Sequence, residues 1–352
     1  MSKYIVEKFK DIEAYTPGEQ PKLGEFIKLN TNESPFAPPL ESSENLLEKV
    51  GNLNIYNDTN CVALTKEFAK YHDVQPENVI FGNGSDEILA FCFLAFCDLD
   101  HGIVYPEITY GFYKSLTGLY SVQAEKIPLN EDFTITISDY YNKNKTVLIA
   151  NPNAPTGITL SPDDIEKIVQ ANPNNVVIID EAYMGFGGES AVHLTKEYEN
   201  LVITGTFSKS RNLAGARLGY AIANKQLISD LNNIRCSYNP YNVNSTTQYL
   251  GLLSIQNDEY YKKCTGEIAN VREKFVDELD SLGFATLPSK ANFIFTKHES
   301  LTGEQVYTKL REHKILVRYF SDEKTKNHVR ISIGTAEQMN SIITALKKIL
   351  EV

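Results

Sequence analysis

Three short segments of the chain combine residue types that could do chemistry on a small molecule. The first is Thr206–Tyr220, where Lys209 lies among small and hydroxyl side chains and Arg217 follows eight residues later. A lysine amine becomes a nucleophile toward aldehydes when burial or a neighbouring cation lowers its pKa toward neutrality. A lone lysine is most often a solvated surface group, so this segment alone does not establish catalysis.

The second segment, Phe81–Glu87, places two glycines and Ser85 between an apolar run and a helical stretch. Free backbone N–H groups, a hydroxyl and the positive end of the helix would converge there on an anion, most simply a phosphate. As a dinucleotide fingerprint the segment is weak, because Glu87 stands where G-x-G-x-x-G has its third glycine. A capped helix after a tight turn is the alternative interpretation.

The third segment is Asp180–Tyr183, which ends the apolar run 175–180. A carboxylate at the end of a buried strand costs free energy unless it meets a cation or a metal, and a protonated ring nitrogen is one such partner. A helix-capping role for Asp180 agrees equally well with this motif alone. Taken together, an amine, an anion cradle and a buried carboxylate are what a pyridoxal phosphate enzyme must supply.

The hydrophobic pattern predicts the elements that position these segments. Between about residues 45 and 240, short apolar runs alternate with stretches of helical period, which is typical of strands and crossover helices in a parallel sheet. Several runs lack polar alternation, as expected for strands covered by helices on both faces. Ligands bind at the carboxyl ends of such strands. The predicted strands are 78–81, 102–105, 122–127, 146–151, 175–180, 201–206 and 218–223.

The two ends of the chain follow a different pattern. After residue 244, long helical stretches precede a mixture of strands and helices, which suggests a smaller α+β domain. The first forty residues are rich in proline and predict an extended arm. We expect an arm over 1–40 that joins the small domain, a large domain over 41–244 and a small domain over 245–352. The elements predicted in this C-terminal part are strands 291–296, 315–320 and 328–333 and helices near 303–313 and 335–350.

Composition limits the class of partner. The chain has 352 residues, of which 22% are charged and 42% hydrophobic, and its formal net charge is −11 at pH 7. This length allows one or two large domains, and the balance excludes a disordered chain or a coiled-coil rod. An acidic chain repels nucleic-acid phosphates and anionic lipid. We therefore expect a small molecule held in a cleft, with neither nucleic acid nor membrane as a partner.

The cysteines, the histidines and the N-terminus predict the redox state, the metal content and the location of the protein. Five scattered cysteines without C-x-x-C spacing predict reduced thiols, mostly in the core, and neither disulfides nor a zinc site. Six histidines lie far apart in the sequence, so no metal cluster is expected. The N-terminus lacks the pattern of a signal peptide, and the most apolar run, 88–97, is about half a membrane span. We expect a cytoplasmic protein.

Motifs along nearly the whole chain resemble those of the fold type I, class I and II pyridoxal phosphate-dependent aminotransferases, most closely the branch that acts on histidinol phosphate. The most specific motifs are T-x-S-K-x₇-R at 206–217 and N-P-x-x-P-T-G at 151–157. The resemblance implies an α/β fold, in which a three-layer large domain with a mostly parallel sheet adjoins a smaller α+β domain. Further matching segments are 15–21, 28–35, 239–244, 317–320 and 329–335.

The resemblance also implies roles for matching residues. Lys209 would form an imine with pyridoxal 5′-phosphate and then carry a proton, Asp180 would keep the pyridine nitrogen protonated, and Tyr183 would donate to the phenolic oxygen O3′. Arg330 would bind the anionic end of the substrate, and Tyr110 would stack on the cofactor ring. The other implied cofactor contacts are Gly84, Ser85, Asp86, Asn153, Thr206, Ser208 and Arg217, and the other implied substrate contacts are Arg318, Tyr15 and Asn32. For Arg318, an edge-strand surface position is the alternative.

Two positions depart from the family pattern. Ala154 stands where an asparagine usually precedes P-T-G, which leaves Asn153 as the candidate donor to O3′. Asn57 replaces the proline of the usual Y-P-D motif. Tyr56 of the same motif matches the tyrosine that reaches the cofactor phosphate of the neighbouring subunit, which implies a homodimer with shared active sites.

The implied reaction is transamination of L-histidinol phosphate with 2-oxoglutarate, which gives imidazole acetol phosphate and glutamate in histidine biosynthesis. An aminotransferase of aromatic amino acids remains an alternative, because an imidazole pocket can take a phenyl ring. A lyase similar to threonine-phosphate decarboxylase is a second alternative, because the sequence does not fix which bond at Cα lies perpendicular to the cofactor ring.

Overall fold

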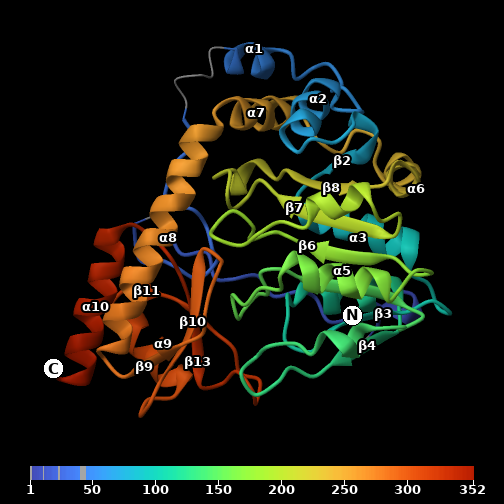
Figure 1. Ribbon diagram of the computed structural model, residues 1–352. Helices are drawn as coiled ribbons and strands as arrows, with labels where there is room; N and C mark the ends of the chain where they lie inside the picture. Colours follow the sequence, from blue (N-terminus) through green and yellow to red (C-terminus); the bar gives the residue numbers. More distant parts are fainter. Residues whose placement is uncertain (1, 11, 23, 40–44) are drawn as a thin grey trace.

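The computed structural model describes residues 2–10, 12–22, 24–39 and 45–352, and a seven-stranded sheet lies at its centre (Figure 1). Its strands are β2 (Val79–Gly82), β3 (Ile103–Pro106), β4 (Ala124–Ile127), β5 (Thr146–Ala150), β6 (Val177–Asp180), β7 (Leu201–Thr206) and β8 (Gly219–Ala223). They lie in the order β2-β8-β7-β6-β5-β3-β4. Every pair is parallel except the two made by β8, which runs against β2 and β7.

Alternate residues of the central strands pack into two separate hydrophobic cores. Ile179 and Ile203 belong to one core, whereas Ile178 and Val202 belong to the other. Because successive side chains of a strand point to opposite faces, the sheet is the middle of three layers, as the sequence predicted. The first face is covered by α2 (Val62–Tyr71), α5 (Pro162–Gln170) and α7 (Ser245–Gln256), and the second by α3 (Ser85–Phe96), α4 (Phe112–Tyr120) and α6 (Lys225–Tyr238).

The reversed strand β8 brings a distant segment to the functional edge of the sheet. Gly219, its first residue, pairs with Gly82, the last residue of β2. The loop that precedes β8 and carries Arg217 therefore lies at the edge where β2, β6 and β7 end. The expectation of strands joined by crossover helices is wrong for this connection, in which the chain turns back from β7 through a loop with one 3₁₀ turn, η5 (Ala214–Ala216).

A second, antiparallel sheet lies beside the first (Figure 1). Its order is β12-β13-β10-β9, with β9 (Phe284–Thr286), β10 (Phe293–His298), β12 (Arg318–Tyr319) and β13 (His328–Ser332). The predicted strand 315–320 is split, because its first part, β11 (Ile315–Leu316), pairs elsewhere. The helices α8 (Asp258–Asp280), α9 (Gly303–Glu312) and α10 (Ala336–Leu350) share a core with this sheet. None of the described helices is long and apolar enough to cross a bilayer.

Both ends of the chain contribute to the small domain, which is built around the antiparallel sheet. The strand β1 (Ile27–Lys28) pairs in parallel with β11, and Leu29 belongs to the core around the small sheet. The predicted domain boundary at 40–41 falls outside the described residues. Leu250 and Ile255 of α7 pack into the core of the large sheet, so we propose that the large domain extends through α7 and ends before α8.

The remaining described helices are η1 (Glu7–Phe9), α1 (Leu46–Gly51), η2 (Pro76–Asn78), η3 (Ile137–Tyr140) and η4 (Val192–Lys196).

The pairing of Gly82 with Gly219 depends on the absence of a side chain at position 219. A Cβ atom on Gly219 would lie 2.3 Å from the carbonyl carbon of Gly84 and 2.3 Å from the nitrogen of Ser85. We predict that Gly219→Ala lowers the free energy of unfolding by about 2 kcal/mol or more, because backbone cannot yield as a side chain can. Urea denaturation measures this change. The control Gly215→Ala meets nothing within 4 Å, and an equal loss in both variants would contradict the close-approach argument.

Candidate active site

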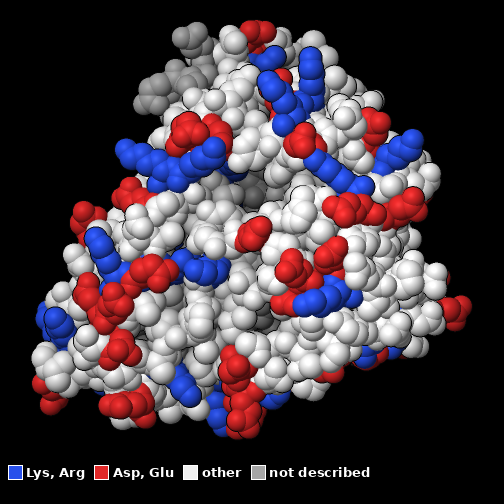
Figure 2. Space-filling model, viewed as in Figure 1, with Lys and Arg blue, Asp and Glu red and all other residues white. Residues whose placement is uncertain are grey.

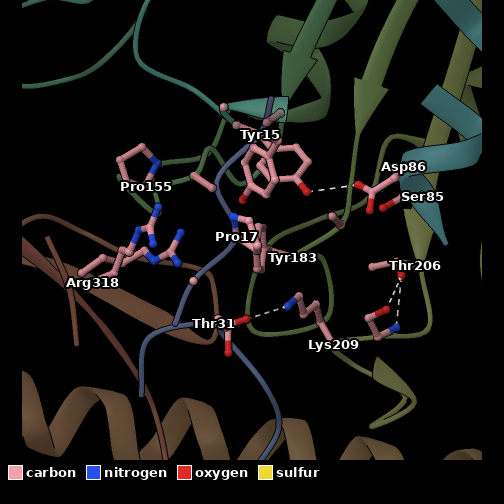
Figure 3. Close-up of a pocket in the computed structure, with 18 of the residues that line it drawn as sticks. Tyr15, Pro17, Thr31, Ser85, Asp86, Pro155, Tyr183, Thr206, Lys209 and Arg318 are labelled. Atoms are coloured by element: carbon pink, nitrogen blue, oxygen red, sulfur yellow. Dashed lines mark hydrogen bonds between the residues drawn. The ribbon is translucent and has the colours of Figure 1, made fainter. Parts of the chain in front are cut away.

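A cavity of about 520 Å³ opens at the carboxyl ends of β6 and β7. Its walls come from the N-terminal arm, the loops of the large sheet and the strands of the small sheet (Figure 3). The structure thus brings together residues that are up to about 300 positions apart in the sequence. The predicted site residues that line it are Tyr15, Ser85, Asp86, Tyr110, Asp180, Tyr183, Thr206, Ser208, Lys209, Arg217, Arg318 and Arg330.

Lys209 lies in the loop after β7 and points toward the arm (Figure 3). Its Nζ donates a hydrogen bond to the carbonyl oxygen of Thr31 at 3.0 Å and lies 5.7 Å from the centre of the Tyr183 ring. Burial, and next the positive charge of Arg330, lower the pKa of Lys209 to about 8. More of this amine is uncharged near neutral pH than in a surface lysine, as a nucleophile or general base requires.

Asp180 ends β6 and is 3% exposed. Its Oδ2 accepts a hydrogen bond from the Tyr113 hydroxyl at 2.8 Å, and its Oδ1 accepts one from Thr204 at 3.2 Å. Burial raises the pKa of Asp180 to about 6, and these two hydroxyl groups oppose the rise. The sequence analysis missed both donors. Thr204 is a polar residue in an apolar strand, which is a usable signal, whereas Tyr113 looks like any core aromatic residue of a helix.

Tyr183 is held by a network that starts in the arm. Its hydroxyl accepts a hydrogen bond from Nδ2 of Asn32 at 3.0 Å, and Oδ1 of Asn32 accepts one from Ser332 at 3.0 Å. Asn32 is 1% exposed and does not line the cavity. The expectation that Asn32 contacts the substrate therefore does not fit this geometry, since its side chain lies behind Tyr183 and positions that hydroxyl.

An anion cradle forms where α3 begins and the loop before β8 passes. Gly84 has a φ of +83°, and a Cβ there would lie 2.4 Å from Nη2 of Arg217. Arg217 also bonds Oδ2 of Asp86 at 3.1 Å and lies 3.4 Å from Oγ of Ser208. A carboxylate cannot donate to an anion, so Asp86 can contribute there only through its backbone N–H. Glycine at 84 leaves the space that the guanidinium fills.

Three hydroxyl groups complete this side of the cavity. Oγ1 of Thr206 lies 2.9 Å from Oγ of Ser208 and accepts a hydrogen bond from the Ser208 backbone at 3.1 Å. The Tyr110 hydroxyl donates to Oδ1 of Asp86 at 3.0 Å. Tyr110, Thr206 and Ser208 line the same cavity as Lys209.

Two arginines from the small sheet form the opposite wall. Arg330 donates to the carbonyl oxygen of Asn30 at 3.0 Å, and its buried Nε has no hydrogen-bond partner among the described residues. Burial lowers the pKa of Arg330. Arg318 bonds the carbonyl oxygen of Thr16 at 3.4 Å, and both guanidinium groups lie 5.7 Å from the ring of Phe320. A half-buried guanidinium with a buried N–H that has no partner points to an anionic ligand.

The arm forms a third wall of the cavity. The Tyr15 ring packs edge-on against Tyr110 and Phe112, with centroids 6.0 Å and 5.7 Å apart. Arg311 of α9 holds the arm through two hydrogen bonds to Glu19, of 2.6 Å and 2.9 Å. Tyr15 lines the cavity as an aromatic side chain that is 40% exposed.

Asn153 and Tyr56, like Asn32 and Gly84, are not among the residues that line this cavity. Both Nδ2 hydrogens of Asn153 are used, since Nδ2 donates to the carbonyl oxygen of Ile108 at 3.0 Å and to Thr156 at 3.1 Å. Asn153 therefore has no free N–H for O3′, and Ala154 lines the cavity instead. Tyr56 is 79% exposed and stacks on Tyr241 with ring centroids 4.4 Å apart, away from the cavity of its own chain.

The donor set fits pyridoxal 5′-phosphate. Lys209 supplies the amine for an aldehyde, and Asp180 supplies a buried carboxylate for a ring nitrogen. The start of α3 and Arg217 form an anion cradle, in which a side chain at position 84 would displace the guanidinium. The unpartnered Nε of Arg330 leaves a donor for a second anion. A three-layer α/β fold with this set at one sheet edge defines a fold type I pyridoxal phosphate-dependent enzyme.

Comparisons with known proteins narrow this class. A family model of aminotransferase class I and II matches residues 24–346, and the chain belongs to this family. The histidinol-phosphate aminotransferase of Brachyspira hyodysenteriae is 46% identical over 353 residues, which cover 100% of both chains. The crystal structure of histidinol-phosphate aminotransferase from Clostridium acetobutylicum has a TM-score of 0.85 at 25% identity, covering 92% of this chain and 99% of that one.

A third likeness concerns the fold alone. The histidinol-phosphate aminotransferase of Sinorhizobium meliloti, solved in complex with pyridoxal-5′-phosphate, has a TM-score of 0.85 at 21% identity. It covers 92% of this chain and 91% of that chain. The family and these structures confirm the fold predicted from the sequence.

We predict that Lys209→Met stabilises the cofactor-free protein at pH 7. The folded state holds the pKa of Lys209 near 8, below its usual 10.5, so it disfavours the charged amine. This penalty is fully present below pH 8 and fades as the pH rises toward 10.5. Urea unfolding should show a gain of about 3 kcal/mol at pH 7 and of about 1 kcal/mol at pH 9.5. The exposed Lys274, changed to Met, is the control, and a gain independent of pH would contradict the prediction.

Proposed function

We propose that this chain transfers an amino group between L-histidinol phosphate and 2-oxoglutarate, with pyridoxal 5′-phosphate as its cofactor. The observation that carries the proposal is Arg330, a half-buried arginine whose buried Nε has no hydrogen-bond partner among the described residues, in one cavity with Arg318, Lys209 and Asp180. The relative from Brachyspira hyodysenteriae, named a histidinol-phosphate aminotransferase, supports the substrate. The reaction would belong to histidine biosynthesis, and the cytoplasm stays the predicted location.

The residues of the cavity divide the chemistry among them. When bound, pyridoxal phosphate supplies an aldehyde that condenses with amines and a ring that withdraws electron density from the substrate Cα. Lys209, with a pKa of about 8, would take the proton from the substrate Cα and deliver it to C4′ of the cofactor. Asp180 holds a proton at the ring nitrogen, because an ionised carboxylate in a buried site stabilises a cation beside it.

The two arginines account for the unusual pair of substrates. A guanidinium binds carboxylate and phosphate alike, in bidentate geometry. Arg330 would bind the carboxylate of glutamate or the phosphate of histidinol phosphate, and Arg318 would add the second positive charge that a dianionic phosphate favours. Tyr15, edge-on to Tyr110, would border the imidazole ring.

The substrate is tested by half-reactions of the protein loaded with pyridoxal phosphate. We expect L-histidinol phosphate to convert the cofactor into its pyridoxamine form about tenfold faster or more than phenylalanine, because only the former has a phosphate for Arg318. Absorbance follows the conversion, and the Lys209→Ala protein should show none. Fast conversion by phenylalanine with none by histidinol phosphate would favour the aromatic alternative. Release of CO₂ from O-phosphothreonine would favour the lyase.

We also propose that the chain acts as a homodimer with shared active sites. Tyr56 follows α1, and the segment 46–56 carries further exposed apolar side chains, namely Leu47, Leu53 and Ile55. An exposed cluster of this kind marks an interaction surface. The Tyr56 ring stacks on Tyr241 and does not line the cavity of its own chain. A partner chain would place this tyrosine beside its own cofactor phosphate.

Mixing two inactive variants tests whether sites are shared. Tyr56→Ala and Lys209→Ala chains, unfolded and refolded together in equal amounts, should regain about a quarter of the wild-type activity, because about half of the dimers are hybrids with one complete site each. The control mixture pairs Tyr56→Ala with a chain that carries both substitutions, and it should stay inactive. If the first mixture gains no activity over its components, Tyr56 does not act across a subunit boundary.

A further inference from the structure

We propose that the buried hydroxyl of Tyr113 is a positioning group for the reaction, because it fixes Asp180 as an ionised acceptor for the cofactor ring nitrogen. This inference rests on the proposed function and names a residue that no sequence motif marks. Tyr113 lies in α4 and is fully buried. It does not line the cavity, so it would act on the cofactor only through Asp180 and its neighbours.

The geometry divides the carboxylate of Asp180 into two sides. Tyr113 bonds Oδ2 at 2.8 Å from α4, and Thr204 bonds Oδ1 at 3.2 Å from the neighbouring strand β7. Neither donor lines the cavity, whereas Asp180 does. Both hydroxyl groups therefore approach from the protein side and leave the cavity side of the carboxylate to a ligand. An ionised carboxylate accepts several hydrogen bonds at once, so a ring N–H can be added without displacing either hydroxyl.

The surroundings of Asp180 explain why these donors are needed. Burial favours the neutral carboxyl, as does the negative charge of Asp86 at the start of α3, and together they raise the pKa of Asp180 to about 6. The Tyr113 and Thr204 hydroxyl groups and the Ala182 backbone N–H oppose that rise. Burial and Asp180 itself raise the pKa of Tyr113 well above its usual value, so the phenol keeps its proton and remains a donor.

The ring of Tyr113 also packs against another residue, and the experiment must separate this packing from the hydrogen bond of the hydroxyl to Asp180. The ring packs edge-on against Tyr110, with centroids 5.6 Å apart and planes at 84°, and Tyr110 is the predicted stacking partner of the cofactor ring. Tyr113→Phe removes the hydroxyl and preserves this packing. Tyr105 of β3 offers a matched control, because it is 2% exposed, its ring lies edge-on to Tyr113 at 5.9 Å, and it is not among the donors to Asp180.

The experiment compares pyridoxal 5′-phosphate with its 1-deaza analogue, in which carbon replaces the ring nitrogen. Dissociation constants of both are measured by absorbance titration of the cofactor-free wild-type, Tyr113→Phe and Tyr105→Phe proteins. We expect Tyr113→Phe to raise the dissociation constant of pyridoxal phosphate about tenfold, as for loss of a hydrogen bond to a charged group. The dissociation constant of the analogue should change less than about twofold. Tyr105→Phe should change neither.

Other outcomes overturn the inference. If Tyr113→Phe weakens the binding of both ligands equally, Tyr113 has a packing role only. If it weakens the binding of neither ligand, Thr204 alone suffices to position Asp180. If Tyr113→Phe does not fold, Thr204→Val removes the other hydroxyl and must show the same selective loss for the inference to stand. A wild-type protein that binds neither ligand would overturn the proposed function itself, whereas wild-type binding with an unselective variant overturns the Tyr113 role alone.

Discussion

The site depends on one close backbone approach, the pairing of Gly82 with Gly219. At that pair the reversed strand β8 starts where β2 ends, and the backbone of Gly84 and Ser85 passes so near that residue 219 has no room for a side chain. This contact places Arg217 against the start of α3. The same sheet edge receives Asp180 from β6 and Lys209 from the loop after β7. A phosphate cradle and the groups that act on a ring are thereby held at fixed positions by one rigid sheet.

The cavity concentrates charges that the fold does not neutralise. Burial lowers the pKa of Lys209 and of Arg330 and raises that of Asp180. The charged form of each group is therefore less favourable in the folded protein than in water. Such unfavourable groups mark functional sites, because a ligand supplies the missing partner. Figure 2 shows acidic and basic side chains interspersed over the outer face. The cavity is lined by four basic side chains and two carboxylates, so its local charge is positive, although the net charge of the chain is −11.

Sequence analysis could predict what is local and could not predict what tertiary contacts decide. The central strands were found because strands buried on both faces are continuous apolar runs, whereas β1 and β9 have only two and three residues and carry no periodic signal. The direction of β8 was missed because parallel and antiparallel neighbours bury the same apolar residues. Lys209, Asp180 and Arg217 stand in contiguous motifs. Asn32 and Tyr113 act through partners about 151 and 67 residues away, and no motif encodes such pairs.

The hydrogen bonds between Asn32 and Ser332 span 300 residues, and they set the order in which the protein can mature. A chain that is still being synthesised cannot orient Tyr183 or complete the arginine wall until β13 has left the ribosome. The sheet of the large domain, complete at residue 223, can fold much earlier, since domains generally form as their residues emerge. Completion of the cavity is therefore a late event in synthesis, and a chain truncated before β13 would lack the complete arginine wall.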